Sequence, residues 1–210
     1  TDMHLSLEES TGPDVTHDDD ALPVVVSAEE MEWPVAEPEW MTVIRPFYDE
    51  NASNEVKQAA MIRYENMFMP STGIALVSNE QEEAFDVLAA LSGTVTRVDN
   101  LPLVGNIVEL EHEDGLKTIY HSLANVAVEE GAQVVQGEVI AQAGRSEIGK
   151  DFGTHLHFEV HKDGEPVNPE HYLPVIAQTN SLPRDVDEAA EVDSVETGVS
   201  PDADSIGDPA

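Results

Sequence analysis

Hydrophobic and polar positions alternate in short runs over the middle of the chain, from about Gly73 to His161. Turn residues such as Asn100, Asp114-Gly115 and Asp163-Gly164 separate one run from the next. Period-two alternation between turn signals is typical of half-buried strands. The pattern therefore predicts an all-β domain, built as a β-sandwich or a partly open barrel. Strands are expected at residues 74–76, 85–88, 93–98, 106–111, 118–123, 134–135, 139–141 and 155–161.

The segment just upstream of these runs changes its period. Residues 43–48 alternate like an edge strand, whereas Asn54 to Tyr64 carries its apolar residues at helical spacing. Asn51 or Ser53 can cap that helix, because a short polar side chain at this place accepts a hydrogen bond from a free N–H group of the first turn. The sequence thus predicts a short N-terminal helix in front of the β domain.

Acidic segments flank the patterned region. The chain has 43 acidic and 9 basic residues, a net charge of −34, and the first basic residue is Arg45. Such segments bury too little apolar surface to offset the entropy lost on ordering. We therefore expect a flexible acidic segment over residues 1–42, one domain over residues 43–174 and a disordered acidic tail over residues 175–210. The neighbourhoods of Trp33 and Trp40 are exceptions that could dock on the domain.

The charge and the composition argue against several classes of partner. Without a basic patch the chain has no footprint for nucleic acid, and an anionic membrane surface would repel it. No apolar run approaches the length of a membrane span, and the absence of cysteine excludes disulfides. The simplest interpretation of the acidity is solubility.

A pair of histidines marks the last predicted strand. His155 and His157 are two residues apart in an apolar context, so both imidazoles are expected on one face of the sheet. Two adjacent imidazoles are half of a metal site or of an acid–base site. The plainer alternative is that both histidines are hydrogen-bonded structural groups. The rest of the chain must decide between these.

Short motifs around this pair resemble those of the LytM-type zinc metallopeptidases of family M23, which cut peptide cross-links in bacterial cell wall. The resemblance covers about half of the chain, from Met69 to Leu173, and it implies the β-rich fold of that family. Its motifs, in chain order, are Ser71-Thr72-Gly73-Ile74-Ala75, Leu91-Ser92-Gly93-Thr94-Val95, Tyr120-His121-Ser122-Leu123, Gly131 to Ile140 and Gly153-Thr154-His155-Leu156-His157.

The same resemblance implies that the catalytic zinc site is lost. Active relatives carry His-x-x-x-Asp, which supplies two zinc ligands, and here the matching positions are Ser71 and Ala75. The histidine of their Tyr-x-His-Leu motif is Ser122 in this chain. The remnants are His155, a catalytic position, and His157, the only residual ligand position. A catalytic zinc site needs about three protein ligands, so we expect no metal, no cofactor and no catalysis.

His121 is not expected to replace the lost histidine. Tyr120 and Leu123 fix the register of the motif, and His121 lies one residue before the family position. Side chains alternate between the two faces of a strand. A one-residue offset should therefore turn His121 to the opposite face.

Within the family, the chain resembles catalytically degenerate members from endospore-forming bacteria. The shared features include Tyr120-x-Ser122-Leu123 and the upstream segment Pro46-Phe47-Tyr48-Asp49, although this chain departs from them in keeping His155 and in lacking the Asp of the first motif. The resemblance implies a non-enzymatic scaffold of the engulfment-stage channel, or feeding-tube, complex. It implies a single-pass forespore membrane protein, with its anchor absent from this chain and this domain in the intermembrane space. The implied partner is a stage III sporulation protein AH homologue of the mother cell, and the complex could form a ring.

Two alternatives remain open. The first is a zinc peptidoglycan endopeptidase that recruits Glu80, Glu82, Glu83 or Asp86 as ligands, although such an acidic run is more typical of a solvated surface. The second is an amidase activator, a role of other degenerate members of the family. Metal analysis separates the enzyme from both binding functions, and a pull-down from sporulating cells separates scaffold from activator.

Overall fold

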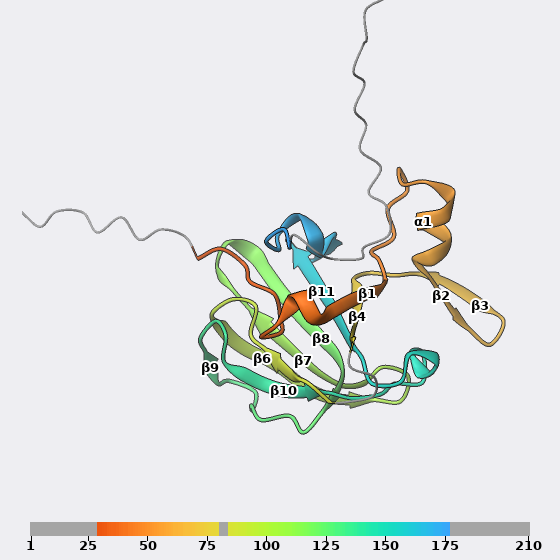
Figure 1. Ribbon diagram of the computed structural model, residues 1–210. Coiled ribbons are helices and arrows are strands. Elements are labelled where there is room, and N and C mark those ends of the chain that lie inside the picture. The colour runs from red at the N-terminus through yellow and green to blue at the C-terminus, as the bar shows by residue number, and fades with distance from the viewer. Residues whose placement is uncertain (1–28, 80–83, 177–210) are drawn as a thin grey trace, which may run out of the picture.

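One open antiparallel sheet contains most of the strands in the computed structural model, which describes residues 29–79 and 84–176 (Figure 1). Every strand expected from the alternation is present, so the all-β prediction is confirmed, and the sheet does not close into a barrel. Its strands are β1 (Met41–Arg45), β4 (Ile74–Ser78), β5 (Asp86–Leu88), β6 (Gly93–Leu101), β7 (Gly105–Glu111), β8 (Leu116–Ala124), β9 (Gln133–Val134), β10 (Val139–Ala143), β11 (Leu156–Lys162) and β12 (Glu165–Val167).

The long path of this sheet runs in the order β1-β4-β11-β8-β7-β6-β9. Strand β10 pairs with both β8 and β5, and β12 extends β11 as a short hairpin. β11, which carries His157 and directly follows His155, therefore lies between β4 and β8. The three family motifs that hold the active-site positions thus come together on three neighbouring strands.

The predicted N-terminal helix is shorter than expected. Helix α1 spans Asn54–Ala59, and Ser53, one of the two expected caps, accepts a hydrogen bond from the backbone of Val56 at 3.4 Å. The extension of the helix to Tyr64 was wrong, because β2 (Met61–Tyr64) pairs with β3 (Met67–Pro70) in a separate hairpin. Pairing with a distant run overrides helical spacing in so short a segment. The hairpin and α1 project from one side of the sheet (Figure 1).

The hydrophobic core includes residues upstream of the expected domain boundary. Met31, Trp33 and Val35 are buried in the same cluster as the sheet, and Nε1 of Trp33 donates to the carbonyl of Pro174 at 2.9 Å. The boundary expected at residue 43 was therefore too late, and residues 29–42 are not a flexible segment. Docking is confirmed for Trp33, whereas Trp40 is 51% exposed. The remaining flank predictions concern residues 1–28 and 177–210, which lie outside the described residues.

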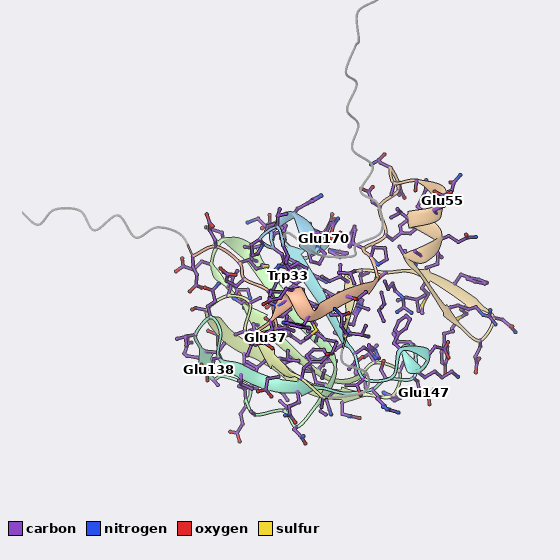
Figure 2. All side chains as sticks on the ribbon, viewed as in Figure 1. Trp33, Glu37, Glu55, Glu138, Glu147 and Glu170 are labelled. Atoms are coloured by element: carbon purple, nitrogen blue, oxygen red, sulfur yellow. The ribbon has the colours of Figure 1, made fainter. Side chains whose placement is uncertain are left out.

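The acidic side chains are spread over the outside of the domain. Figure 2 shows Glu55, Glu138 and Glu147 on different elements around the periphery, while Trp33 lies near the centre of the view and Glu37, close to it, is exposed. No single acidic surface is evident among the labelled residues, which agrees with a general solubilising role of the charge.

A β-bulge in β1 decides which way Arg45 points. Val43 pairs with Leu76, whereas Arg45 pairs with Ala75, because the register shifts between them. Leu76 and Ala75 are consecutive and so face opposite sides of the sheet. The bulge therefore places Val43 on the core side and turns Arg45 to the other side, which a regular strand would not do.

A second irregularity lies in β8. Tyr120 and Leu123 both belong to the core cluster although they are three residues apart. Between them Ser122 has φ 64, a left-handed conformation that interrupts the alternation. Before this point the register with β11 is regular, so His121, one residue after the core residue Tyr120, faces away from the core and pairs directly opposite His157 of β11. We call the sheet surface that carries Ala75, His157 and His121 the site face.

Candidate functional site

A row of four side chains crosses the site face from strand to strand. Arg45 of β1 pairs with Ala75 of β4, Ala75 pairs with His157 of β11, and His157 pairs with His121 of β8. Directly paired residues of antiparallel strands project to the same side, with Cβ atoms about 5 Å apart. The row thus brings together one family ligand position that is kept, one that is lost and two residues that the family motifs do not include.

The prediction that His121 faces away from the site was wrong. Its ring lies edge-on to that of His157, with centroids 5.3 Å apart. His121 follows the core residue Tyr120 in a regular register and so points away from the core, whereas the left-handed backbone at Ser122 interrupts the alternation only after it. His121 and Ser122 therefore both belong to the site face.

The positions of the lost zinc ligands hold residues that do not fit a metal. Ala75 is fully buried and offers His157 only a methyl group. Ser71 is buried, and its hydroxyl donates to the carbonyl of Gly73 at 2.8 Å. Over the described part of the chain, no three His, Cys, Asp or Glu side chains are arranged to hold an ion. The donor set around His157 thus lacks what zinc chemistry requires.

The acidic residues considered as substitute ligands are not assembled around His157 either. Asp86 is exposed on β5 and accepts a hydrogen bond from Gln142 at 3.1 Å. Glu80, Glu82 and Glu83 lie outside the described residues.

His155 is enclosed by hydrogen bonds. Its Nδ1 donates to the carbonyl of Gly153 at 2.9 Å, which leaves Nε2 of the neutral ring as an acceptor. The hydroxyls of Ser122 and Ser146 lie 2.8 and 3.1 Å from Nε2. Burial lowers the pKa of His155, so the neutral ring is favoured. Both nitrogens are occupied within the protein, and the imidazole presents no free atom to a substrate.

A carboxylate that no family motif predicted is the centre of the other half of the site. Glu159 follows His157 by two residues on β11 and is buried on the same face. It accepts from Nε2 of His157 at 3.1 Å, from Nε2 of His161 at 2.8 Å and from the hydroxyl of Thr72 at 2.7 Å. Nε2 of His121 lies 3.8 Å away. One carboxylate thus connects three imidazoles and the turn that precedes β4.

These contacts fix the protonation states of the cluster. Burial alone would raise the pKa of Glu159, but the hydrogen bonds from His157 and His161 outweigh it and hold that pKa well below its ordinary value. Burial, reinforced by the neighbouring His157, lowers the pKa of His121 to about 4. Glu159 is therefore ionised and His121 neutral near pH 7.

Two ring nitrogens of this cluster are enclosed without a hydrogen-bond partner, Nδ1 of His121 and Nδ1 of His157. Nε2 of His157 is bound to the carboxylate of Glu159, so Nδ1 is the ring nitrogen that is left without a partner. Ala75 and Ser71, which stand where the family's other ligands would be, send no group to it. The spacing His157-x-Glu159-x-His161 was the one sequence signal that could have revealed this cluster.

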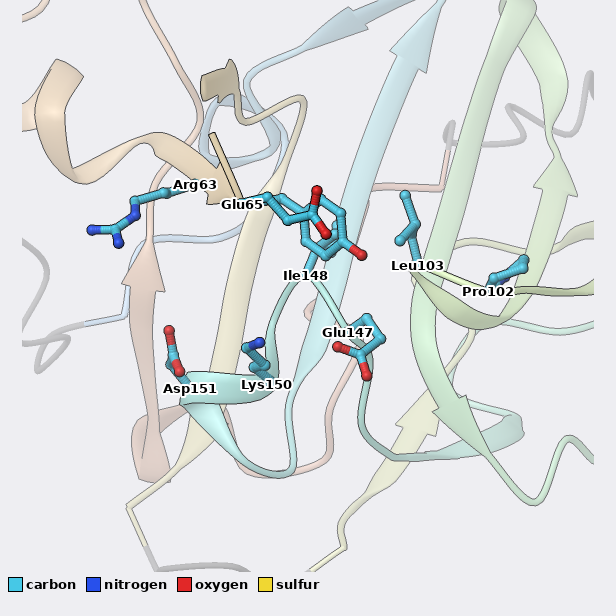
Figure 3. Close-up of a pocket in the computed structure, with 9 residues that line it drawn as sticks. Arg63, Glu65, Pro102, Leu103, Glu147, Ile148, Lys150 and Asp151 are labelled. Atoms are coloured by element: carbon cyan, nitrogen blue, oxygen red, sulfur yellow. The ribbon is translucent and has the colours of Figure 1, made fainter. Parts of the chain in front are cut away.

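A separate cleft of about 740 Å³ opens between the β2–β3 hairpin and the loop that precedes β11 (Figure 3). Arg63, Glu65, Glu147 and Lys150 give it a mixed charge, and Leu103 and Ile148 are among its apolar lining. None of the family's active-site positions lines this cleft. It adds no catalytic group to the site face.

The fold and the altered ligand positions together define an M23-type peptidase domain with a substituted metal site. Residues 69–169 match the model of Peptidase family M23. The chain is also 41% identical to a chain of the solved SpoIIQ–SpoIIIAH pore-forming complex, with a TM-score of 0.67, over 70% of this chain and 92% of that one. The chain belongs to the M23 family.

Its similarity extends to one particular group within that family. Stage II sporulation protein Q of Bacillus subtilis (strain 168) is 38% identical over 180 residues, which are 85% of this chain and 63% of that protein. A crystal structure of a SpoIIIAH and SpoIIQ complex contains a chain that is 42% identical, with a TM-score of 0.64, over 66% of this chain and 96% of that one. These findings confirm the resemblance to the degenerate sporulation members. Among the described residues, no helix combines the length and the apolar character needed to cross a bilayer.

Proposed function

We propose that this domain is a non-enzymatic scaffold of the sporulation apparatus. The observation that carries the proposal is the pairing of Ala75 with His157, because a buried methyl group stands where active relatives place a zinc-binding carboxylate. His157 alone cannot hold a catalytic zinc ion in competition with ordinary three-ligand sites. The fold is retained while the chemistry is not.

The second catalytic position supports the same conclusion. Ser122 takes the place of a histidine that would face the substrate, and it instead lies 2.8 Å from Nε2 of His155. The residues at the two former acid–base positions, Ser122 and His155, are thereby hydrogen-bonded to each other. General acid–base catalysis needs a group that is free to exchange a proton with the substrate.

The partner in this proposal is a stage III sporulation protein AH homologue on the mother-cell side. Support comes from the identity to SpoIIQ chains solved in complex with SpoIIIAH. The chain would sit in the space between the forespore and mother-cell membranes, held by a forespore anchor that is not part of the described domain. In this location it would contribute to a channel complex.

The sheet offers a physical route to such a contact. β1 is the terminal strand of the long path, and no described strand pairs with its outer edge. An unpaired edge presents a row of backbone donors and acceptors to which a partner strand can add. β1 is therefore the first candidate for the docking edge.

Metal content is the test of the enzymatic half of the proposal. Protein purified without chelators should contain far less than one zinc ion per chain and should release no peptide fragments from peptidoglycan. An active M23 peptidase prepared in the same way is the control. One tightly bound zinc ion per chain, together with cleavage, would establish the endopeptidase alternative.

Partner binding is the test of the other half. Titration calorimetry should detect a complex between residues 29–176 and the soluble domain of a stage III sporulation protein AH homologue from the same organism. Residue 29 is the appropriate start because Met31 and Trp33 belong to the core. The full chain should bind within a few fold of the trimmed protein, since the flanks have the composition of solvated chain. His157→Ala should leave the affinity unchanged, because the former metal position is not the proposed interface. Absence of binding by both proteins, with a partner shown to be folded, would refute the scaffold function.

A further inference from the structure

Arg45 is a nearly buried cation with no counter-ion among the residues that the structure describes. Only 8% of the residue is exposed, and its guanidinium lies 4.5 Å from the centre of the Phe152 ring. Within residues 29–79 and 84–176, its side chain forms no ion pair and no hydrogen bond with any group. Its nitrogen atoms are also not among the fully enclosed atoms that lack a partner, so they retain some contact with solvent.

A buried arginine without a counter-ion destabilises the folded protein. Arginine stays protonated under all ordinary conditions, and an uncompensated charge removed from water costs several kcal/mol. Burial accordingly lowers the pKa of Arg45. The Phe152 ring offsets part of the cost by about 1 kcal/mol or somewhat more. The five N–H donors of its planar fork have no protein acceptor among the described residues.

The geometry shows which acceptor is missing. The bulge in β1 turns Arg45 to the site face, directly across from Ala75. Active M23 relatives carry a carboxylate at the position of Ala75, and a carboxylate there would lie beside the guanidinium. In this chain the methyl group of Ala75 leaves the cation unpaired. The wall of the former metal site has thus become a site with a fixed positive charge.

The groups around Arg45 do not cancel this charge. His155 contacts Phe152 edge-on at 5.7 Å, and its ring is neutral because burial lowers its pKa. Glu159, the buried carboxylate of the site face, is already bound to His157, His161 and Thr72. An anion that reached Arg45 would meet no competing internal acceptor.

We propose that Arg45, with Phe152 behind it and Ala75 opposite it, binds a carboxylate supplied from outside the domain. The planar fork of the guanidinium matches the two oxygens of a carboxylate, so that two parallel N–H···O bonds form. A monoanion is favoured over a phosphate dianion, because the −34 net charge of the chain repels the doubly charged ligand more strongly. The carboxylate can belong to a free small molecule or to a polypeptide, as a Glu or Asp side chain or as a chain terminus.

The direct test follows the side-chain Nε resonance of Arg45 by ¹⁵N NMR on the folded protein. Sodium acetate is titrated against sodium chloride at constant ionic strength, followed by N-acetyl-alanyl-alanine, its C-terminal amide and N-acetyl-glutamate amide. We expect a saturable shift of Arg45 with the carboxylates and none with the amide of the dipeptide. Tighter binding of either peptide than of acetate would identify a polypeptide source, and equal binding a small-molecule source.

Variants make the assignment specific. Arg45→Met keeps the length of the stem without the fork, and because it lacks the Arg45 resonance its binding is followed through the backbone amide of Phe152. It should lower the affinity for acetate at least about tenfold, because a charge-assisted contact of this kind contributes roughly 1.5 to 3 kcal/mol. Ala75→Asp places a carboxylate opposite Arg45 and should abolish binding by occupying the fork from within. Arg63→Met removes an exposed arginine of β2 and is the matched control, with affinity unchanged.

Two results would overturn the proposal. One is a wild-type protein whose Arg45 resonance responds to acetate no more than to chloride. The other is binding that persists in both Arg45→Met and Ala75→Asp. The NMR experiment on the unmodified protein does not depend on the folding of either variant, and the proposal does not depend on the identity of the protein partner.

Discussion

His155 and His157 differ in how completely their ring nitrogens are hydrogen-bonded. His155 uses both ring nitrogens, with Gly153 on one side and Ser122 and Ser146 on the other. His157 uses one ring nitrogen and leaves the other enclosed without a partner. Both are buried and they are only two residues apart, at the start of β11, so burial alone does not explain the contrast.

The difference lies in what replaced their former neighbours. Next to His155, the family's histidine became Ser122, whose hydroxyl can hydrogen-bond to an imidazole. Next to His157, the family's carboxylate became Ala75, which has no polar atom. A buried polar atom left without a partner costs about 1–3 kcal/mol, whereas a satisfied one is close to neutral or stabilising. The His155 half of the site is therefore a satisfied hydrogen-bond network, whereas the His157 half keeps a buried nitrogen without a partner.

Truncation of the two histidines should give the largest contrast. We expect His155→Ala to cost about 3–5 kcal/mol of unfolding free energy, because it opens a cavity and strands the carbonyl of Gly153 and two serine hydroxyls. His157→Ala should cost only about 1–3 kcal/mol, since it removes one hydrogen bond together with an unpaired nitrogen. Urea unfolding of both variants at pH 7.5 measures the difference. Equal losses would show that His157 is as well integrated as His155.

Acid should destabilise the domain through His121 and Glu159, the two groups beside His157 whose pKa values are lowered on folding. The pKa of His121 is about 4 in the folded protein and about 6.5 in the unfolded chain, so both states are neutral above pH 6.5. Between pH 6.5 and 4 the unfolded chain binds a proton that the folded protein does not. Stability should fall through that window by up to about 3 kcal/mol. Below about pH 4.3 the lowered pKa of Glu159 adds a further loss, because only the unfolded chain then takes up that proton.

The corresponding measurement is the unfolding free energy at pH 7.5, 6, 5 and 4. His121→Gln should flatten the slope between pH 6.5 and 4, and the matched replacement of the exposed His171 should not. A slope that survives in His121→Gln would assign the acid sensitivity to other groups.

A substitution that crowds the ring of His155 should lower the unfolding free energy by an intermediate amount. A methyl group at Gly149 would collide with Nε2 of His155, which Ser122 and Ser146 hold in place. Gly149→Ala should therefore cost about 1–3 kcal/mol by displacing the ring. Thermal unfolding reports the loss, with Lys150→Ala, an exposed neighbour, as the control. An unchanged midpoint would mean that the ring is free to move.

The smallest expected effect is that of the second serine. Ser146→Ala leaves Ser122 as the donor to Nε2 of His155, so about 1 kcal/mol or less should be lost. The double variant with Ser122→Ala should lose more than the sum of the single variants, because Nε2 then has no partner. Strict additivity in this cycle would contradict the idea of a shared network.

The fold could be predicted from the sequence because local alternation and turn residues specify each strand independently. The hairpin β2–β3 could not, since Met61 to Tyr64 fits a helix and a strand equally until its pairing with Met67–Pro70 is known. Packing of Met31 and Trp33 was hidden for a related reason. A few apolar residues in an acidic segment gain a core only from strands far away in the chain.

The family motifs predicted which active-site positions are replaced, but they did not predict which other side chains lie beside them. The family motifs placed Ser71, Ala75, Ser122, His155 and His157 on neighbouring strands, and the structure brings the three motifs together. The position of Arg45 depends on a bulge in β1 and that of Ser122 on a left-handed residue in β8, neither of which alternation can foresee. A single extra residue in a strand reverses the face of everything that follows it.

The hydrogen bond between Trp33 and Pro174 joins two points that are 141 residues apart. A pull applied through the chain before Trp33 and after Pro174 would be borne first by this indole and its packing against the core. The strands of the sheet would be loaded only after that contact had broken, because the two points of traction already lie together. While this contact holds, tension would pass from one end of the domain to the other without loading the sheet. The sheet edges would then keep their shape while the chain on either side is stretched.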